Sequence, residues 1–513
     1  MHQTKYIVIL GSIMSGLGKG ILTASIGKIL KERGFNVLPI KFDGYLNYDC
    51  GTMNPFRHGE VFVLEDGSEV DMDFGTYERF LNMNLTGKAS LTGGKVFKTI
   101  IEKERKGEYL GRDVQFIPHV TDFIKTYIQD YGKGVDFVII EVGGTVGDIE
   151  NNYFIEAMRQ LSLNNDVMFI QLTYLPQLRD EQKTKPTQQA NKLIMSMGIK
   201  PHMIVARTSE KLKKETIDKI ALYTNVDVKN VISDPDVNIV YKLPLILEKQ
   251  HVFDIIADYF NIVAKKKPNF SQWEKKINRW ENGIVKQIGI VGKYVMKDAY
   301  VSIFEALKHG GMDLGIKPNI EIVDAEQLNN LDKYDGLIIA GGFGKRGIEG
   351  KIKAINYARI HKTPLLGLCL GLQLMIVEYA RNVLGWKDAN STEFDPNTTH
   401  PVIDLLPEQK RIIEKGATMR LGCYPMDIKT GTLLHSIYEK TRVCERHRHR
   451  YEVNPDYVND LEKAGLVISA TYKHVVEAIE YKNGLGIGLQ SHPELSSKVE
   501  EPSPIFKYFL SKI

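Results

Sequence analysis

The first candidate functional residues of this sequence form a glycine-rich turn near the start of the chain. Residues 11–20 read GSIMSGLGKG, after the apolar run YIVIL at 6–10 and before ILTASIGKILKE at 21–32. The apolar run predicts a buried parallel strand, and the later segment has the apolar spacing of a helix. At such a corner, backbone N–H groups, the helix dipole and the mobile charge of Lys19 converge, as phosphate binding requires. A glycine-rich turn without a ligand is the alternative on this stretch alone.

The turn departs from the strict P-loop pattern. That pattern needs Gly at position 13 and Ser or Thr at position 20, where this chain has Ile13 and Gly20. Because the missing hydroxyl would otherwise bind Mg²⁺, we expect carboxylates from other segments to hold any Mg²⁺. Asp73, in a long polar loop, and Glu141, in a strand predicted at 136–142, are the candidates. Solvated acids without a metal are the alternative.

A second cluster suited to phosphates is KTKPTQ at residues 183–188. It follows a strand predicted at 167–174 and opens a helix at Pro186. Two lysines and two hydroxyls therefore meet the positive end of a helix dipole, which favours a second polyphosphate. An ordinary charged surface is the alternative.

The sharpest chemical signal is a cysteine in the C-terminal half. The sequence PLLGLCLGLQ at 364–373 predicts an apolar strand that runs into Cys369 and then into a helix. This is the geometry of a nucleophile elbow, where the helix dipole lowers the pKa of a thiol. Far downstream, His492 and Glu494 alternate and therefore face the same side. His492 can take and return the proton, while Glu494 orients its ring.

A third feature supports a catalytic cysteine. The turn AGGFG at 340–344 offers backbone N–H groups for an oxyanion hole. A lone Cys in an apolar run is usually a core residue. The combination of Cys369, Gly341–Gly342 and His492-x-Glu494 favours a nucleophile instead.

The segments that position these residues predict an α/β fold with two doubly wound, mostly parallel-sheet domains. In the first half, strands are expected at 36–42, 136–142, 167–174 and 202–206, with helices near 119–131, 149–161 and 209–223. In the second half, strands are expected from 285 and at 319–324, 336–340 and 364–368. We expect domains at 1–265 and 285–513, joined by a linker at 266–284. Ligands of such sheets bind at the carboxyl ends of the strands.

The charge and cysteine content of the sequence argue against nucleic-acid and membrane partners. The net charge of +4 over 513 residues is too small for a nucleic-acid or polybasic membrane footprint. The four cysteines show no paired spacing, and the sequence shows no leader pattern or long apolar run. We expect a cytoplasmic protein without nucleic-acid or membrane partners.

The C-terminal half resembles class I glutamine amidotransferases, which release ammonia from glutamine, and the whole chain resembles the CTP synthase family. The motifs that carry this resemblance are GSIMSGLGKG at 11–20, GTMNP at 51–55, HGEVF at 58–62, YERF at 77–80, EVGGTVGDIE at 141–150, KTKPTQ at 183–188, NSTEF at 390–394 and ERHRHRYE at 445–452. They span nearly all of the chain.

The resemblance implies a reaction in pyrimidine nucleotide synthesis. ATP phosphorylates O4 of UTP, and ammonia displaces the phosphate to give CTP, ADP and phosphate. Glutamine supplies the ammonia through a thioester on Cys369, and free ammonia can replace it. The resemblance also implies Mg²⁺, inhibition by CTP, activation by GTP, and a homotetramer that can form higher filaments.

By position, the resemblance assigns ATP binding to Gly16, Leu17, Gly18, Lys19, Gly20, Ile21, Asp73, Asp236 and Val237. It assigns UTP or CTP binding to Ser15, Asp148, Ile149, Glu150, Lys183, Thr184, Lys185, Pro186, Thr187, Gln188 and Lys219. It assigns glutamine binding to Gly342, Leu370, Gly371, Leu372, Gln373, Glu393 and Arg450. It assigns Mg²⁺ to Asp73 and Glu141, support of phosphoryl transfer to Lys41, the ammonia path to Pro55, His58 and Val61, and catalysis to Cys369, His492 and Glu494.

Some positions depart from the family pattern. Met14 and Gly16 replace residues common in bacterial members, in a loop that works through its backbone. Pro235 stands where many members have Lys, next to the expected adenine contact at Asp236. Val301 stands where bacterial members have a Lys linked to GTP stimulation.

Two other functions compete with this interpretation. Another ATP-dependent amidoligase with a fused glutaminase, such as a cobyrinic acid amide synthase, would not need residues 183–188 for a second triphosphate. A non-catalytic regulator that senses nucleotides would have no reason to keep Cys369, His492 and Glu494 together.

Overall fold

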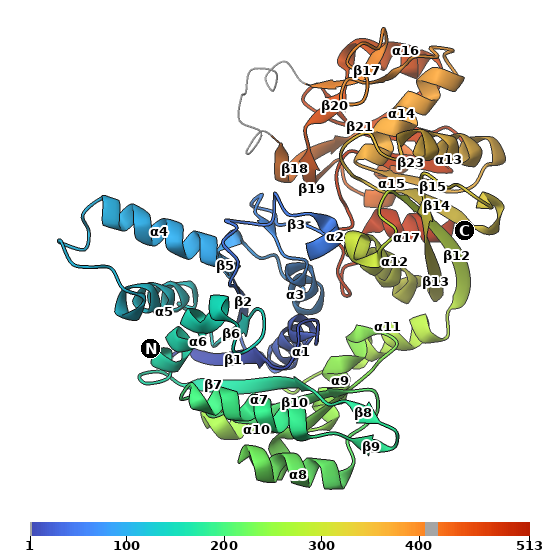
Figure 1. Ribbon diagram of the computed structural model, residues 1–513. Coiled ribbons are helices and arrows are strands. Elements are labelled where there is room, and N and C mark those ends of the chain that lie inside the picture. The colour runs from blue at the N-terminus through green and yellow to red at the C-terminus, as the bar shows by residue number, and fades with distance from the viewer. Residues whose placement is uncertain (1–2, 406–418) are drawn as a thin grey trace. The chain divides into compact units, whose positions relative to one another are not determined.

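The computed structural model describes residues 3–405 and 419–513, and they form two compact α/β units. The first unit comprises Met1–Thr52 and Thr76–Gln272, and the second comprises Met53–Gly75 and Trp273–Ile513. Each unit has its own sheet with helices packed against it (Figure 1). None of the helices in the described part of the chain is long and apolar enough to cross a membrane.

The first unit is built on a seven-stranded sheet in the order β11-β10-β7-β1-β6-β2-β5, and its pairings are parallel. The strands are β1 (Lys5–Gly11), β2 (Val37–Asp43), β5 (Ser90–Thr92), β6 (Phe137–Val142), β7 (Val167–Tyr174), β10 (Met203–Thr208) and β11 (Val231–Pro235). The helices that connect them include α1 (Lys19–Glu32), α4 (Gly93–Arg105), α5 (Thr121–Tyr131), α6 (Asn152–Leu161), α7 (Lys185–Ser196), α8 (Lys214–Thr224), α9 (Leu243–Lys249) and α10 (Val252–Phe260).

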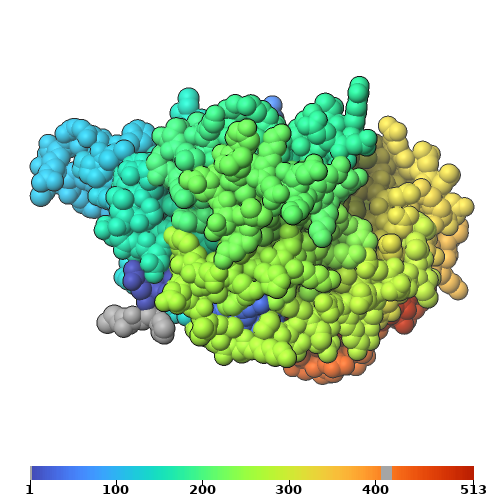
Figure 2. All heavy atoms as spheres, turned by 90° about the horizontal axis from the view of Figure 1, so that it is seen from below, coloured from blue at the N-terminus to red at the C-terminus, as the bar shows by residue number. Residues whose placement is uncertain are grey.

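Both faces of this sheet are buried, which explains why its strands are continuous apolar runs. In β1, Tyr6 and Val8 pack with α5 and α6, whereas Ile7 and Ile9 pack with α1, α9 and α10. Side chains alternate across a strand, so an apolar run fills two cores at once. The green segments that include α7 to α10 form much of the outer surface seen in Figure 2.

The second unit has a nine-stranded sheet in the order β13-β12-β14-β15-β23-β22-β21-β18-β19. Its strands are β12 (Ile284–Gly292), β13 (Ile316–Asp324), β14 (Gly336–Ile339), β15 (Leu365–Leu368), β18 (Arg420–Ile428), β19 (Arg442–His449), β21 (Leu466–Tyr472), β22 (Val475–Tyr481) and β23 (Gly486–Leu489). Its larger helices are α12 (Val301–Leu314), α13 (Ile348–His361), α14 (Leu370–Asn382) and α17 (Pro504–Ser511).

This second sheet is mixed. The pairings from β13 to β23 are parallel, and those from β23 through β22, β21 and β18 to β19 are antiparallel. The sequence analysis predicts the parallel strands but not the antiparallel extension. A smaller sheet of β16 (Asn390–Ser391), β17 (Pro401–Leu405) and β20 (Tyr451–Val453) lies in the same unit.

The segment Met53–Gly75 packs with the second unit, although the sequence analysis groups it with the N-terminal domain. It contains α2 (Pro55–His58) and the hairpin of β3 (Phe62–Val63) and β4 (Glu69–Val70). The Glu60 carboxylate accepts a hydrogen bond from the N–H of Ser302 at 3.0 Å, and Arg446 donates to the Val63 carbonyl at 3.1 Å.

The expected linker at 266–284 contains a helix, α11 (Ser271–Glu281). Its Trp273, Ile277 and Trp280 are buried, at the i, i+4, i+7 spacing of one helix face. One face of this helix is therefore apolar and buried. The sequence analysis did not recognise this face, because many residues of the segment are charged.

The four cysteines show no paired spacing in the sequence, but two of them are paired in the structure. Cys423 in β18 and Cys444 in β19 form a disulfide, because the antiparallel pairing of these strands brings their Cα atoms within 5.6 Å. Cys50 and Cys369 are buried and take no part in a disulfide.

A core substitution tests whether the helices pack against the first sheet as described. Phe154 in α6 is fully buried and stacks on Phe42 with ring centroids 4.7 Å apart. Phe154→Ala is expected to destabilise the first unit by about 3–5 kcal/mol, since it removes a large side chain and leaves a cavity. Urea unfolding followed by circular dichroism measures the change. Leu163→Ala, at a position that is 67% exposed, is the control, and equal effects of the two substitutions would contradict the packing described.

Candidate active site

The glycine-rich turn lies at the carboxyl end of β1 and leads into α1, as a phosphate-binding corner requires. Gly18 is the N-cap of α1 with a φ of 90°, and Gly16 has a φ of 76°. Ser15 and Gly16 are exposed, whereas Leu17 and Gly20 are buried. The backbone of the turn is therefore accessible to a ligand at Ser15 and Gly16, while the buried Leu17 side chain fixes the turn to the core.

Lys19 lies inward in this structure. Its Nζ donates to the Gly144 carbonyl at 2.7 Å, and a Cβ at Gly11 would come within 2.8 Å of the same Nζ. A side chain at position 11 would therefore displace Lys19 from its present place. Ile13, which occupies the place of a P-loop glycine, has a φ of 82°. A β-branched residue in the left-handed region is strained, and such strain is typical of functional turns.

Two further predicted residues meet at the carboxyl edge of the same sheet. Lys41 in β2 pairs in register with Glu141 in β6. Glu141 is 2% exposed and accepts hydrogen bonds from the hydroxyls of Tyr77 and Thr23. Lys41 forms an ion pair with Asp43 at 3.6 Å. A buried carboxylate is stable only when such donors satisfy it.

Asp73 begins α3 (Asp73–Leu81), and its N–H donates to the Asp71 carboxylate at 2.8 Å. Within residues 3–405 and 419–513, no group of three or more His, Cys, Asp or Glu side chains is placed to hold a metal ion. Mg²⁺ bound to nucleotides uses one or two carboxylates and the substrate phosphates. The oxygen donor of Glu141 fits that type of site.

The residues predicted to bind UTP or CTP lie on four segments of the first unit: the glycine-rich turn with Ser15, the loop after β6, residues 183–188, and α8 with Lys219. Lys183 follows β9 (Glu181–Gln182) and forms an ion pair with Glu181. The charges of Lys183 and Lys219 both lower the pKa of the Glu181 carboxyl, so the two lysines lie near one acid. Lys185 is exposed, and Pro186 is the second residue of α7.

Other members of the 183–188 cluster are hydrogen-bonded within the first unit. Thr184 and Gln188 are buried and hydrogen-bonded to each other at 3.0 Å, and Thr187 bonds Thr173 at 3.2 Å. They hold the start of α7 against the sheet.

The loop after β6 holds the next predicted residues. Asp148 accepts a hydrogen bond from the Thr145 N–H at 2.8 Å, while Ile149 is 85% exposed and Glu150 is exposed. At another edge of the sheet, Asp236 pairs with Arg207 at 2.8 Å, next to Val237.

The predicted nucleophile Cys369 lies between β15 and α14, with a φ of 54° and 4% exposure. Its N–H donates to the Leu489 carbonyl of β23 at 2.7 Å. Its Sγ lies 3.8 Å from the Gln490 side-chain nitrogen and 3.9 Å from the Arg448 carbonyl. The positive φ at the start of a helix is the strained elbow expected from the sequence.

The histidine and carboxylate lie beside this cysteine. His492 Nδ1 and Glu494 Oε1 are 2.7 Å apart, and the N–H of His492 donates to the Arg446 carbonyl at 2.7 Å. Burial alone would lower the pKa of His492, but the charges and hydrogen bonds of Glu494 and Cys369 outweigh burial and raise this pKa well above its usual value. This environment favours the imidazolium form of His492 beside Cys369.

The side chains predicted to hold glutamine surround the same point. Glu393 accepts a hydrogen bond from the Gly344 N–H at 2.9 Å. Burial raises the pKa of Glu393, while that N–H, Lys293 and Arg450 oppose the rise, so two cations lie near the carboxyl. Lys293 was not predicted from the sequence.

The first turn of α14 is packed rather than open. Leu370, Gly371 and Leu372 are buried, and a Cβ at Gly371 would lie 2.3 Å from the Ile339 carbonyl. Gln373 donates to the Tyr451 carbonyl at 2.8 Å.

A small hollow of about 110 Å³ adjoins the triad within the second unit. Its walls include Pro55 and Val61, which were predicted to line an ammonia path, together with Gly342 and His492. His58 is exposed and is not among the lining residues. Gly341, predicted as an oxyanion donor, and Glu494, predicted as a triad member, also line the hollow. The sequence analysis assigned no role to the remaining wall residues: Glu60, Tyr294, Ala299, Tyr300, Ile303, Phe343, Arg448 and Leu495.

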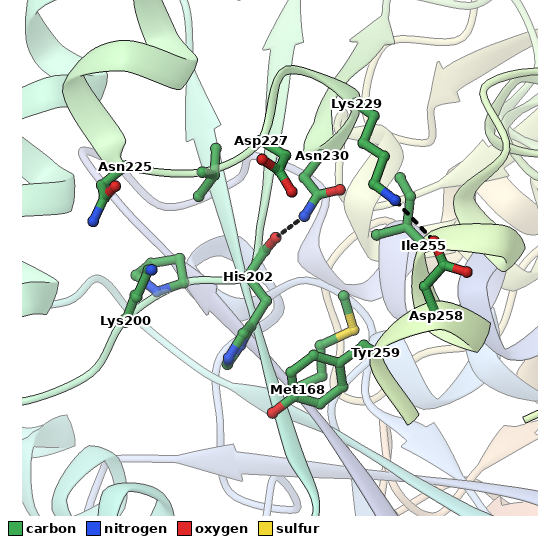
Figure 3. A pocket seen from close by; sticks show the side chains of 12 residues that line it. Met168, Lys200, His202, Asn225, Asp227, Lys229, Asn230, Ile255, Asp258 and Tyr259 are labelled. Carbon is green, nitrogen blue, oxygen red and sulfur yellow. Dashed lines mark hydrogen bonds and ion pairs between the residues drawn. The ribbon is translucent and has the colours of Figure 1, made fainter. Parts of the chain in front are cut away.

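A separate pocket of about 410 Å³ lies at the amino-terminal ends of β7, β10 and β11 (Figure 3). Two of its lining residues, Lys229 and Asp258, form an ion pair at 2.8 Å. His202 accepts a hydrogen bond from the Phe169 N–H, and burial lowers its pKa to about 4. None of the predicted site residues lines this pocket.

Two protein-family models match the chain and show its general class. A protein-family model described as glutamine amidotransferase class-I matches residues 295–512, and a model described as CTP synthase N-terminus matches residues 5–262. A chain with these two parts is a glutamine-hydrolysing ligase that forms C–N bonds.

Individual relatives define the family. A CTP synthase of Pyrococcus furiosus is 49% identical over 98% of this chain and 97% of its own length. A CTP synthase of Hydrogenobaculum sp. is 50% identical over 99% of this chain and 98% of its own. The glutaminase domain of Trypanosoma brucei CTPS with bound acivicin is 36% identical, with a TM-score of 0.41, over 44% of this chain and 93% of that chain. The chain belongs to the CTP synthase family.

The pair of His492 and Glu494 generates a prediction for glutamine hydrolysis. In Glu494→Gln the carboxylate no longer raises the pKa of His492, so the imidazolium is lost at a lower pH. We expect kcat to fall by about 10²–10⁴-fold and the alkaline limb of kcat/KM to move to lower pH. Rates of glutamate release between acidic and alkaline pH measure both effects. An unchanged alkaline limb would contradict the role given to Glu494.

Proposed function

We propose that this chain catalyses the ATP-dependent amination of UTP to CTP, with glutamine as the nitrogen donor. The observation that carries the proposal is the grouping of Cys369, His492 and Glu494 around one point in a chain of the CTP synthase family. In this proposal, residues 1–265 form the amidoligase domain and residues 285–513 the glutaminase domain, joined through residues 266–284.

The glutaminase half of the reaction follows from the geometry around Cys369. The thiolate attacks the amide carbon of glutamine, and the proton held on His492 passes to the leaving ammonia. Water then hydrolyses the thioester with His492 as the base. Backbone N–H groups of the turn at Gly341–Gly342 stabilise the oxyanion, while Glu393 and Arg450 hold the amino acid ends of glutamine.

The synthetase half depends on charges at the carboxyl edge of the first sheet. Lys19 and Lys41, with the exposed backbone at Gly16, bind the phosphates of ATP, and Lys183, Lys185 and Lys219 bind those of UTP. Phosphorylation of O4 turns a poor leaving group into phosphate, which ammonia displaces at C4. Asp73 and Glu141 would hold Mg²⁺, which neutralises charge on the transferred phosphoryl group.

Delivery of ammonia inside the protein protects it as a nucleophile, because free ammonia is largely protonated at neutral pH. Pro55 and Val61 in the wall of the hollow beside His492 support an exit for ammonia there. We place His58 further along the same path.

Regulation belongs to the same proposal. CTP inhibits by occupying the site of its substrate, with its base and ribose read by Asp148–Glu150. GTP stimulates glutamine hydrolysis, but more weakly than in members with Lys at position 301, because Val301 carries no charge.

We propose a cytoplasmic homotetramer that can form higher filaments. Leu110, Phe116 and Ile117, between α4 and α5, are 87%, 57% and 54% exposed, which supports association through this apolar surface.

The direct test is incubation with UTP, ATP, Mg²⁺ and glutamine, followed by the ultraviolet change from uracil to cytosine. We expect CTP with either glutamine or ammonium salt. The absence of CTP with both nitrogen sources would refute the proposal, and amidation of a carboxylate substrate would favour another amidoligase.

Cys369→Ala separates the two half-reactions. Glutamine-dependent synthesis is expected to fall by about 10⁴-fold or more, as for loss of a nucleophile, while ammonia-dependent synthesis stays near the wild-type rate. Parallel assays with the two nitrogen sources measure this difference. Equal loss of both activities in a folded variant would contradict the two-site account.

Asp73→Asn and Glu141→Gln test the proposed metal carboxylates. Synthesis from both nitrogen sources should fall by about 100-fold or more, with a higher KM for Mg²⁺, while basal glutamine hydrolysis persists. Glu215→Gln, at an exposed position on α8, is the control. Full synthesis in the two test variants would exclude the metal role.

A further inference from the structure

A buried lysine lies behind the turn that follows β14. Lys351, in α13, has no exposed surface. Its Nζ donates to the Ala340 carbonyl at 2.6 Å and lies 3.5 Å from the Gly341 carbonyl. Lysine is almost never fully buried unless its charge is paired. Two backbone carbonyls are therefore unusual partners for a fully buried ammonium group.

The other side of this turn faces the catalytic residues. A Cβ placed on Gly341 would lie 3.0 Å from His492 Cε1 and 3.7 Å from Cys369 Cβ. Gly341 and Gly342 also line the hollow beside His492. One short stretch of backbone thus separates Lys351 from the triad.

Peptide geometry links the lysine to the N–H groups of this stretch. In a planar trans peptide the C=O and N–H bonds point in opposite directions. Because the carbonyls of Ala340 and Gly341 point toward Lys351, the N–H groups of Gly341 and Gly342 point away from it. Donation to a carbonyl also polarises the peptide and strengthens its N–H as a donor.

We propose that Lys351 is a positioning residue for glutamine hydrolysis. It orients and polarises the oxyanion-binding N–H groups of Gly341 and Gly342 and places a positive charge behind the site. This inference rests on the proposed glutaminase function of Cys369, and neither the triad nor the glutamine contacts described above include Lys351.

The electrostatics of the lysine agree with this role. Burial and, to a lesser degree, the charge of Lys293 lower the pKa of Lys351 to about 7, while the charge of Cys369 opposes both effects. The interaction between the two side chains is attractive when Lys351 is protonated and negative charge lies on Cys369. Electrostatic interactions of this kind are stronger in a water-excluded site than in water.

Lys351→Met tests the proposal, because methionine has a similar length but neither charge nor donor. We expect kcat for glutamine hydrolysis to fall by about 100-fold, the loss typical of one oxyanion donor, with KM changed less than about threefold. The rate of Cys369 alkylation by iodoacetamide is followed by mass spectrometry of its peptide at a series of pH values. In the variant, the midpoint of this pH dependence should shift to higher pH. Lys353→Met, at an exposed position of the same helix, should leave both measurements unchanged.

Two outcomes would overturn the proposal. One is glutamine hydrolysis by the folded Lys351→Met protein within threefold of wild type. The other is loss of ammonia-dependent synthesis or of folding in both Lys351→Met and Lys351→Arg, which would assign the lysine a structural role. Failure of the proposed function itself is distinguishable, because the wild-type chain would then hydrolyse no glutamine.

Discussion

The parallel pairing of β15 with β23 is the constraint on which the glutaminase site depends. Leu368 and Leu489 are register partners, and the N–H of Cys369 donates to the Leu489 carbonyl at 2.7 Å. Both strands therefore end at the same level, and the chain after each strand leaves from the same edge. Cys369 and His492, which are far apart in the sequence, meet because of this register.

A buried network of charges joins three strands of the second unit. Arg420 donates to Glu452 at 3.1 Å and to Glu477 at 2.6 Å, with both carboxyls fully buried. Burial raises the pKa of Glu452 to about 8, although Arg420 opposes this rise. The network ties β18, β20 and β22 together behind β19, whose Arg446 carbonyl receives the N–H of His492. Removal of one member would leave a buried charge without its partner.

The sequence predicted the features that depend on local pattern. The glycine-rich corner, the cysteine elbow and the His492-x-Glu494 pair each have a short signature, and the parallel strands are apolar runs because two cores bury them. The antiparallel half of the second sheet was missed, since its strands mix charged and apolar residues. The burial of Arg446 and Glu477 within them is visible only after folding.

Contacts between distant segments could not be predicted either. Glu60 binds the start of α12 through Ser302, and Lys351 binds the turn at Ala340. The HGEVF motif that contains Glu60 gives no sign of a contact with Ser302, and Lys351 belongs to none of the motifs quoted above. Trp273 and Trp280 lie on the same face of α11, which is evident only when the segment is known to be a helix. A motif assigns His58 to the ammonia path, and this assignment stays a prediction; in the structure the side chain is exposed.

The central claim is that nitrogen freed at Cys369 is used to aminate UTP without mixing with ammonia in solution. Synthesis with glutamine labelled with ¹⁵N in its amide, in the presence of excess unlabelled ammonium at a pH where free ammonium is used slowly, tests this claim directly. Mass spectrometry of the product should find the label in nearly all of the CTP. Dilution of the label to the isotope ratio of the ammonium in solution would contradict the account.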